Sequence, residues 1–199
     1  MQIHPSHFTE DDIAERQRLG LDLFDEEWEG VYHVTPAPSV DHQVVLTGLL
    51  RFLGALLESR GGGTVLPEVN VFREGPKQPD YRVPDLVFVA LGREAIIARD
   101  GIRGGAPDAI FEILSPRDES YQKFGFYAAI GVPEILIVGP EERAAEVWAL
   151  AEGRYMKVPA GADGAVVSRA LEVSFRTQAG SPARLELTDR RNPSRRVTI

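Results

Sequence analysis

Two short apolar runs stand out in the chain, because each carries a single acidic residue. The first begins at the Pro-Asp step that ends in Asp85, and the β-branched and aromatic residues at 86–90 are typical of a buried strand. The second, residues 108–114, holds Glu112 in its middle and is closed by a Ser-Pro step, which cannot continue a strand. The pattern places Asp85 at the mouth of one strand and Glu112 inside another.

The segment 117–130 follows the second run and is predicted to be a helix, with Asp118 as its N-cap and a glycine as its stop. Lys123 and Tyr127 are four residues apart, so they share one face of this helix. An ionised carboxylate in apolar surroundings is costly unless it finds a cation. A helix packed against the preceding strand would bring Lys123 to Glu112.

The rest of the pattern predicts an α/β domain with a central mixed sheet flanked by helices. The strongest helix is capped by Ser39 and ends at the glycines 61–63, and its most apolar stretch, 44–57, is interrupted by Arg51 and is too short to span a bilayer. We therefore expect no membrane association. Other predicted elements are a helix after Thr9, a short helix at 93–98, and strands at 30–34, 64–72, 134–138, 145–150, 154–158, 171–175 and 185–187.

Length and composition favour one domain over residues 1–199, since the chain is 43% hydrophobic and long enough for a sizeable core. Residues 1–8 are expected to be a flexible arm. Residues 189–199 hold four arginines without an apolar period, which predicts a flexible tail or, alternatively, weak affinity for nucleic acid. The absence of cysteine excludes disulfides and thiolate zinc sites, and the absence of a signal pattern favours a cytoplasmic protein.

The net charge of −8 argues against a protein that coats nucleic acid by bulk attraction, although a local basic rim remains compatible with it. Asp85, Glu112 and Lys123 would together suit metal-assisted hydrolysis of a phosphodiester. Carboxylates bind a hard cation such as Mg²⁺ or Mn²⁺, and an ammonium orients water or steadies the phosphate. Taken singly, the same residues also fit a turn cap, a structural ion pair and a solvated lysine.

Candidate substrate contacts lie on both sides of the proposed acids. A β-turn-β hairpin leading into the Asp85 strand would place Arg73, Lys77 and Arg82 around the site, and Tyr127 lies on the helix of the lysine. A solvated turn is the alternative for the three basic residues.

An ordered set of short motifs runs through about residues 26–150. The motifs are Glu29-Gly30-Val31, Pro36-Ala37-Pro38-Ser39 with His42, Pro84-Asp85, Glu112-Ile113-Leu114-Ser115-Pro116, Lys123 with Tyr127, and Gly131-Val132-Pro133-Glu134 before a hydrophobic strand. In this order they resemble the Uma-two-type restriction endonuclease family, a bacterial group formerly described as a domain of unknown function. The resemblance implies the PD-(D/E)xK nuclease fold, with a restriction-endonuclease-like core.

The resemblance also implies roles for particular residues. Asp85 and Glu112 match the metal ligands, and Lys123 matches a lysine that has migrated to the helix, because Leu114 occupies its usual strand position. Glu26 matches an acid that comes from the first helix and assists the metal site. The acid four residues before the lysine corresponds to Glu119, or is replaced by its neighbour at 118.

These features together predict a metal-dependent endonuclease that acts on DNA, with Asp85 and Glu112 binding Mg²⁺ or Mn²⁺. Cutting two strands needs two sites, so a homodimer is expected. The alternative is a nuclease-fold module that no longer cuts and instead binds a partner. A serine hydrolase built on Ser115 is disfavoured, because the chain lacks a Gly-x-Ser-x-Gly elbow. His42 is interpreted as a structural or surface residue and remains worth testing as a base.

Overall fold

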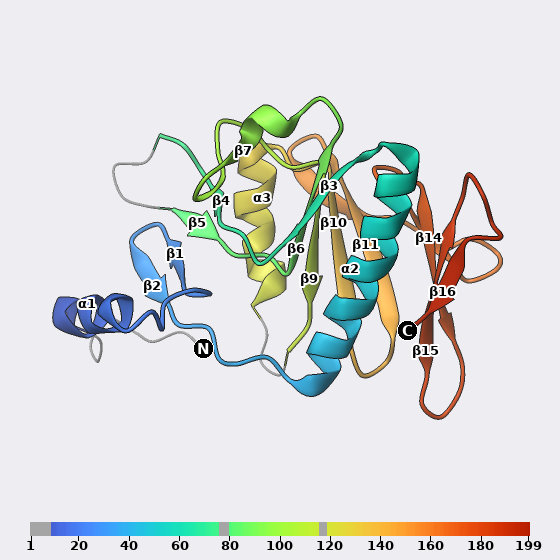
Figure 1. Cartoon of the computed structure of the whole chain (residues 1–199), viewed down its shortest axis with the longest axis horizontal. Coiled ribbons are helices and arrows are strands. Elements are labelled where there is room, and N and C mark those ends of the chain that lie inside the picture. The colour runs from blue at the N-terminus through green and yellow to red at the C-terminus, as the bar shows by residue number, and fades with distance from the viewer. Residues whose placement is uncertain (1–8, 76–79, 116–118) are drawn as a thin grey trace.

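The computed structural model describes residues 9–75, 80–115 and 119–199. Its centre is a mixed sheet, as the sequence predicts, and the strand order is β12-β11-β10-β9-β6-β3 (Figure 1). Strands β9 and β10 are parallel, and the other neighbouring pairs are antiparallel. The strands of this central sheet are β3 (Gly63–Pro67), β6 (Leu86–Ala90), β9 (Ala109–Ile113), β10 (Glu134–Gly139), β11 (Ala144–Ala151) and β12 (Arg154–Lys157).

Each face of the central sheet packs on its own hydrophobic cluster. One cluster joins Phe111 of β9 to helix α2 (Val40–Arg60) and to strands formed by residues 166–198. The other joins Ile110 to helix α3 (Phe124–Ile130). Successive residues of a strand point to opposite faces, so Glu112 shares the α3 side with Ile110. Figure 1 shows α3 on one side of the sheet and α2 on the other.

Helix α2 begins and ends as its sequence predicts. The Ser39 hydroxyl accepts a hydrogen bond from the amide of His42 at 3.1 Å, and Gly61 adopts the left-handed conformation with φ 58°. The helix is long and apolar enough to cross a membrane by length and composition alone. Its leucines, including Leu49 and Leu53, instead pack against the central sheet, which is the role of a core helix.

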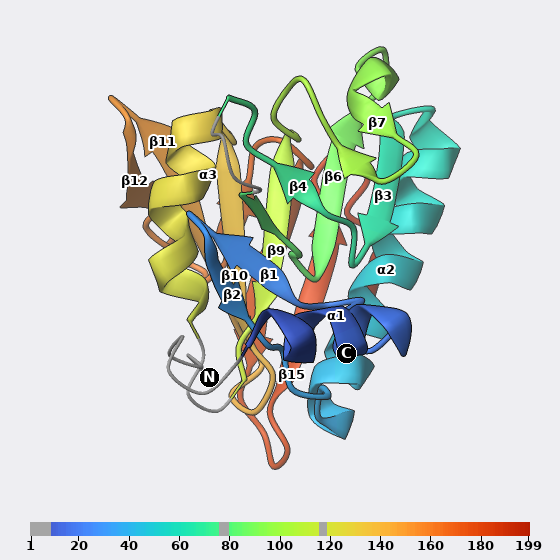
Figure 2. The ribbon, with the colours of Figure 1, turned by 90° about the vertical axis from the view of Figure 1, so that its left-hand side faces the viewer.

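A second sheet, here called the outer sheet, has the order β2-β1-β5-β4-β8-β7 and lies on the α3 side (Figure 2). Its strands are β1 (Glu26–Trp28), β2 (Val31–His33), β4 (Val71–Phe72), β5 (Tyr81–Arg82), β7 (Ile97–Ala98) and β8 (Gly101–Ile102). The strand predicted at 64–72 is therefore two strands in two sheets. The break comes at Glu68, a non-glycine residue with φ 51°.

The helix predicted after Thr9 is present, and the helix predicted at 117–130 is shorter than expected. Helix α1 (Glu10–Arg18) begins with a capping box between Thr9 and Asp12. The predicted helix at 117–130 is a 3₁₀ turn at Ser120–Lys123 followed by α3, which ends at a left-handed Gly131. The predicted cap Asp118 lies outside the described residues, as does the predicted arm 1–8.

The C-terminal residues form a third sheet of order β13-β14-β15-β16, here called the C-terminal sheet. Its strands are β13 (Val166–Ser168), β14 (Val173–Gln178), β15 (Arg184–Asp189) and β16 (Arg196–Thr198). The prediction of an unstructured tail from 189 is wrong, because Val197 and Ile199 pack against the core. A β-carbon on Gly48 would lie 2.6 Å from the Ile199 side chain, so the glycine makes room for this contact.

Glu134 connects the central sheet to the C-terminal sheet. Its buried carboxylate accepts hydrogen bonds from the Ser168 hydroxyl at 2.6 Å and from the amides of Arg169 and Ala170 at 2.8 and 3.3 Å. We expect Glu134→Ala to lower the free energy of unfolding by about 2–4 kcal/mol, because it leaves these buried donors unpaired. Urea denaturation measures this, with Glu141→Ala at an exposed acid as the control. Equal stability of the two variants would contradict the role given to Glu134.

Candidate active site

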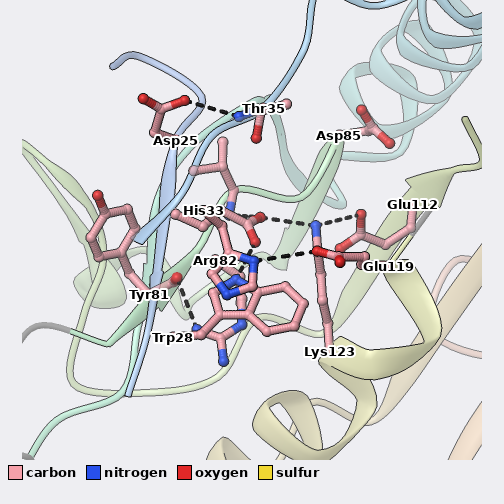
Figure 3. A network of polar contacts seen from close by, with 12 residues as sticks. Asp25, Trp28, His33, Thr35, Tyr81, Arg82, Asp85, Glu112, Glu119 and Lys123 are labelled. Carbon is pink, nitrogen blue, oxygen red and sulfur yellow. Dashed lines mark hydrogen bonds and ion pairs between the residues drawn. The ribbon is translucent and has the colours of Figure 1, made fainter. Parts of the chain in front are cut away.

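The ammonium of Lys123 lies between two buried carboxylates. Its Nζ is 2.9 Å from Oε1 of Glu26 and 3.0 Å from Oε2 of Glu112. The three residues come from the outer sheet, from the turn before α3 and from the middle of β9, and Figure 3 shows the lysine reaching toward Glu112 from the helix below it. The predicted meeting of Glu112 and Lys123 is therefore present in the structure.

Glu112 is buried on the α3 side of β9, as the alternation of that strand requires. The hydroxyl of Tyr127 donates to Oε1 of Glu112 at 2.6 Å, so both residues of the predicted helix face touch this one carboxylate. Burial raises the pKa of Glu112 to about 8, and the charges of Asp85 and Glu26 act in the same direction while Lys123 and Tyr127 oppose them. Glu112 is thus a carboxyl group whose ionisation depends on nearby positive charge.

Asp85 lies just before β6 and contacts two other elements, strand β9 and helix α2. Its Oδ2 accepts a hydrogen bond from the amide of Ile113 at 2.5 Å, and its Oδ1 lies 3.0 Å from Nε2 of His42. The first contact fixes Asp85 against the end of β9, one residue past Glu112. The second connects it to the first turn of α2, so His42 is a positioning contact of the proposed metal ligand.

Glu26 does not come from a helix, as the resemblance implied, but from strand β1 at the edge of the site. Its Oε1 accepts from the amide of Val83 at 2.8 Å and its Oε2 accepts from the indole of Trp28 at 2.6 Å. These bonds and Lys123 compensate a carboxylate that is 4% exposed. Glu26 is therefore a buried acid at the start of a strand, and its cation partner lies far along the chain.

The predicted basic contacts are engaged elsewhere. Arg82 is buried, with its guanidinium carbon 4.4 Å from the ring centroid of Trp28 and 4.2 Å from that of Phe126, and it pairs with Asp80 at 2.9 Å. Arg73 pairs with the same aspartate at 2.6 Å. Neither arginine lines the pocket described next, and Lys77 lies outside the described residues. Arg82 therefore stabilises strand β1, which carries both Trp28 and Glu26.

The acids line a cavity of about 310 Å³ between the outer sheet, the end of β9 and the start of α2. Two further acids line it: Glu119, one of the two alternatives that the resemblance offered, and Glu68, for which the sequence predicted no role. Glu119 lies 3.3 Å from Nδ1 of His33, and the amide of Glu68 donates to the backbone carbonyl of Asp85 at 3.2 Å. Burial, followed by the charge of Asp85, raises the pKa of Glu68. The left-handed conformation of Glu68 has no signal in the sequence.

The charge of this cavity fits a divalent cation. Five carboxylates and one ammonium line it among the described residues: Glu26, Glu68, Asp85, Glu112, Glu119 and Lys123. Burial raises the pKa of Glu112 most, the charges of Asp85 and Glu26 add to it, and a hard cation would oppose both effects. No group of three or more His, Asp or Glu side chains in the described part of the chain is already arranged around one point for a metal.

Comparisons with known proteins identify the family and the fold of this chain. Residues 21–180 match the family model Uma2, which is described as "Putative restriction endonuclease". Among solved structures, a protein from Anabaena variabilis described as a "putative nuclease belonging to DUF820" superposes with a TM-score of 0.59 at 17% identity, covering 74% of this chain and 82% of that one. This likeness shows the restriction-endonuclease-like fold. No match was found among curated proteins.

Proposed function

Because the chain belongs to the Uma2 family of restriction endonuclease-like proteins, we propose that it is a Mg²⁺-dependent endonuclease that hydrolyses phosphodiester bonds in DNA. The observation that carries the proposal is the Lys123 ammonium within 3.0 Å of two buried carboxylates, beside Asp85 in one cavity. A structural ion pair needs one acid. Here the ammonium contacts two acids, Glu26 and Glu112, and three more line the same cavity, which is more negative charge than an ion pair needs and is what a metal-assisted hydrolase requires.

Each residue has a task that follows from its contacts. Asp85 and Glu112 would hold the cation, which when bound supplies Lewis acidity and neutralises charge on the phosphate. The amide of Ile113 and the imidazole of His42 fix the orientation of Asp85, and the hydroxyl of Tyr127 fixes that of Glu112. Lys123 would place its ammonium on a phosphate oxygen or on the attacking water, and Glu26 holds that ammonium in position.

Cleavage of plasmid DNA in Mg²⁺, and its loss in EDTA, tests this function. Asp85→Asn keeps the shape of the side chain but removes its charge, so we expect cleavage to fall by about two orders of magnitude or more. Glu141→Gln is the matched control at an exposed acid outside the cavity. A wild-type protein that binds Mg²⁺ without cutting any DNA would favour the non-catalytic module instead.

A homodimer forms part of the proposal, because breaking both strands of a duplex requires two cavities of this kind. Sedimentation velocity with and without a DNA duplex measures it. A monomer in both conditions would restrict the proposed activity to nicking or to single strands.

The raised pKa of Glu112 predicts the pH dependence of metal binding. Its pKa is raised to about 8, so at pH 7 much of the folded protein carries a proton on this carboxyl, and a bound cation would displace it. We expect Mg²⁺ affinity to rise between pH 6 and pH 8, with release of about one proton at pH 7. Calorimetry in two buffers of different ionisation enthalpy counts the proton. Affinity that does not change over this range would contradict a role for Glu112 as ligand.

A further inference from the structure

Positive charge is concentrated at the C-terminal end of this acidic chain. Residues 166–199 contain seven arginines and three acids, whereas the whole chain contains 22 basic and 30 acidic residues. Five of the seven arginines follow residue 180, so they lie beyond the segment that matches the family model. The C-terminal sheet is thus a basic element attached to an acidic body.

The strand alternation of this sheet turns arginines outward. Leu185 and Leu187 of β15 and Val197 of β16 pack against the core, so Arg184 and Arg196 lie on the opposite, solvent-facing side. Both are exposed, and no ion pair of either is found within the described residues. The same side carries hydroxyl groups at Ser174, Thr188 and Thr198, and one acid, Glu186, which pairs with Arg176 and accepts from the amide of Gln178. We call this side the basic sheet face.

A surface groove connects this sheet to the candidate active site. Its lining begins at Pro38, which also lines the active-site cavity, and ends at Ile199, which follows β16. Between them the groove follows the exposed side of α2, where Val40 and Val44 make the lining mostly apolar and Gln43, Thr47 and Arg51 supply polar groups and a cation. We call it the α2 groove. It is open rather than enclosed, so an extended chain can lie along it.

The hairpin of β14 and β15 points toward the same end of the molecule as the cavity. The hydroxyl of Thr177 donates to the carbonyl of Arg143 at 2.9 Å, and Arg143 lies 3.7 Å from Asp41 at the start of α2. His42, which follows Asp41 in the chain, contacts Asp85. Figure 1 shows this hairpin and the start of α2 together at the lower end of the structure.

We propose that the α2 groove and the basic sheet face bind the phosphate backbone of the nucleic acid whose phosphodiester lies at the acidic cavity. The proposal rests on the proposed function. A cavity lined by five acids repels a polyanion unless a cation is bound, so the backbone needs contacts elsewhere. Arginine, serine, threonine and glutamine side chains are the usual donors to phosphate oxygens. A second copy of this chain suits the face less well, because a two-fold contact would place its arginines against one another.

The test is the binding of a labelled DNA duplex without metal, by fluorescence anisotropy, so that it does not depend on cleavage. Arg51→Gln with Arg196→Gln removes one cation from each surface. Arg18→Gln with Arg154→Gln is the control, because it removes the same charge from exposed positions on α1 and β12. Circular dichroism and melting temperature establish that both proteins fold.

We expect the Arg51 and Arg196 substitutions to weaken binding about tenfold at physiological salt. They should also reduce the slope of log affinity against log salt by about 2, since two phosphate contacts are lost. The control should move neither quantity. Equal weakening in both proteins, or none in either, would overturn the proposal. A change of sedimentation coefficient without a change of DNA affinity would overturn it too, by assigning the face to self-association. If the wild type binds DNA through these arginines but does not cleave it, only the proposed catalytic function is refuted.

Discussion

Glu112→Gln is expected to reduce Mg²⁺-dependent cleavage by about a thousandfold while leaving the protein folded. The substitution removes one of the two proposed ligands, and metal-assisted hydrolysis depends on the charge of that carboxylate. The loss of charge should not harm the fold, since burial already disfavours the ionised form of Glu112. Lys123 keeps its second partner, Glu26, at 2.9 Å.

The pH dependence of the free energy of unfolding distinguishes a role of Glu112 in metal binding from a role in stabilising the fold. The folded pKa of Glu112 lies above its unfolded value of 4.5, so the folded state holds the proton more tightly and stability falls as pH rises from about 4.5 to 8. The glutamine variant lacks this contribution. We therefore expect it to match or exceed the wild type in stability at pH 9, by urea denaturation. Unfolding of the variant at pH 9 would show that the charged Glu112 serves the fold.

Lys123→Met is expected to have the second large effect, and here the fold is also affected. The substitution leaves Glu26 and Glu112 buried without their shared cation, which typically costs about 3–5 kcal/mol. Protonation of Glu112 relieves part of that loss, because without the lysine its pKa rises further. The destabilisation should therefore be smaller at pH 6 than at pH 9. Thermal melts at the two pH values measure this difference.

The activity of the same variant tests the role of the ammonium. Turnover should fall about a hundredfold or more, whereas the affinity for Mn²⁺ should stay level or increase, since a competing positive charge has gone. Lys157→Met is the control, because Lys157 also pairs with a glutamate, Glu146, but is half exposed. Parallel loss of turnover and metal affinity in Lys123→Met would contradict a role in positioning water or phosphate.

The centre of the site could be predicted because its signals are local. Glu112 is an acid inside an apolar strand, and Lys123 and Tyr127 share a helical face four residues apart, so simple periodicity brings them together. Asp85 follows from its position at the mouth of the neighbouring strand. The central sheet and α2 were predictable for the same reason, since their periods and caps lie within single segments.

The edges of the site were not predictable, because long-range contacts decide them. Glu26 lies in an acidic run with no apolar period, and its burial depends on Lys123, almost a hundred positions later. Arg82 looked like a phosphate contact, but Trp28 and Phe126 enclose its guanidinium. The arginine-rich segment 189–199 has no strand pattern, yet it contains the short strand β16, whose one inward side chain is Val197. Edge strands this short leave too few positions for a pattern to show.

The most direct test of the account is calorimetric titration of Mn²⁺ and Mg²⁺ into the wild type and into Glu112→Gln at pH 8. The account predicts that the wild type binds the metal, and that the glutamine variant has lost this binding while its circular dichroism is unchanged. Equal binding by both proteins would contradict the assignment of Glu112 as a ligand, and with it the proposed metal site. Absence of binding by the folded wild type, with DNA present as well as without it, would contradict the metal-dependent nuclease itself.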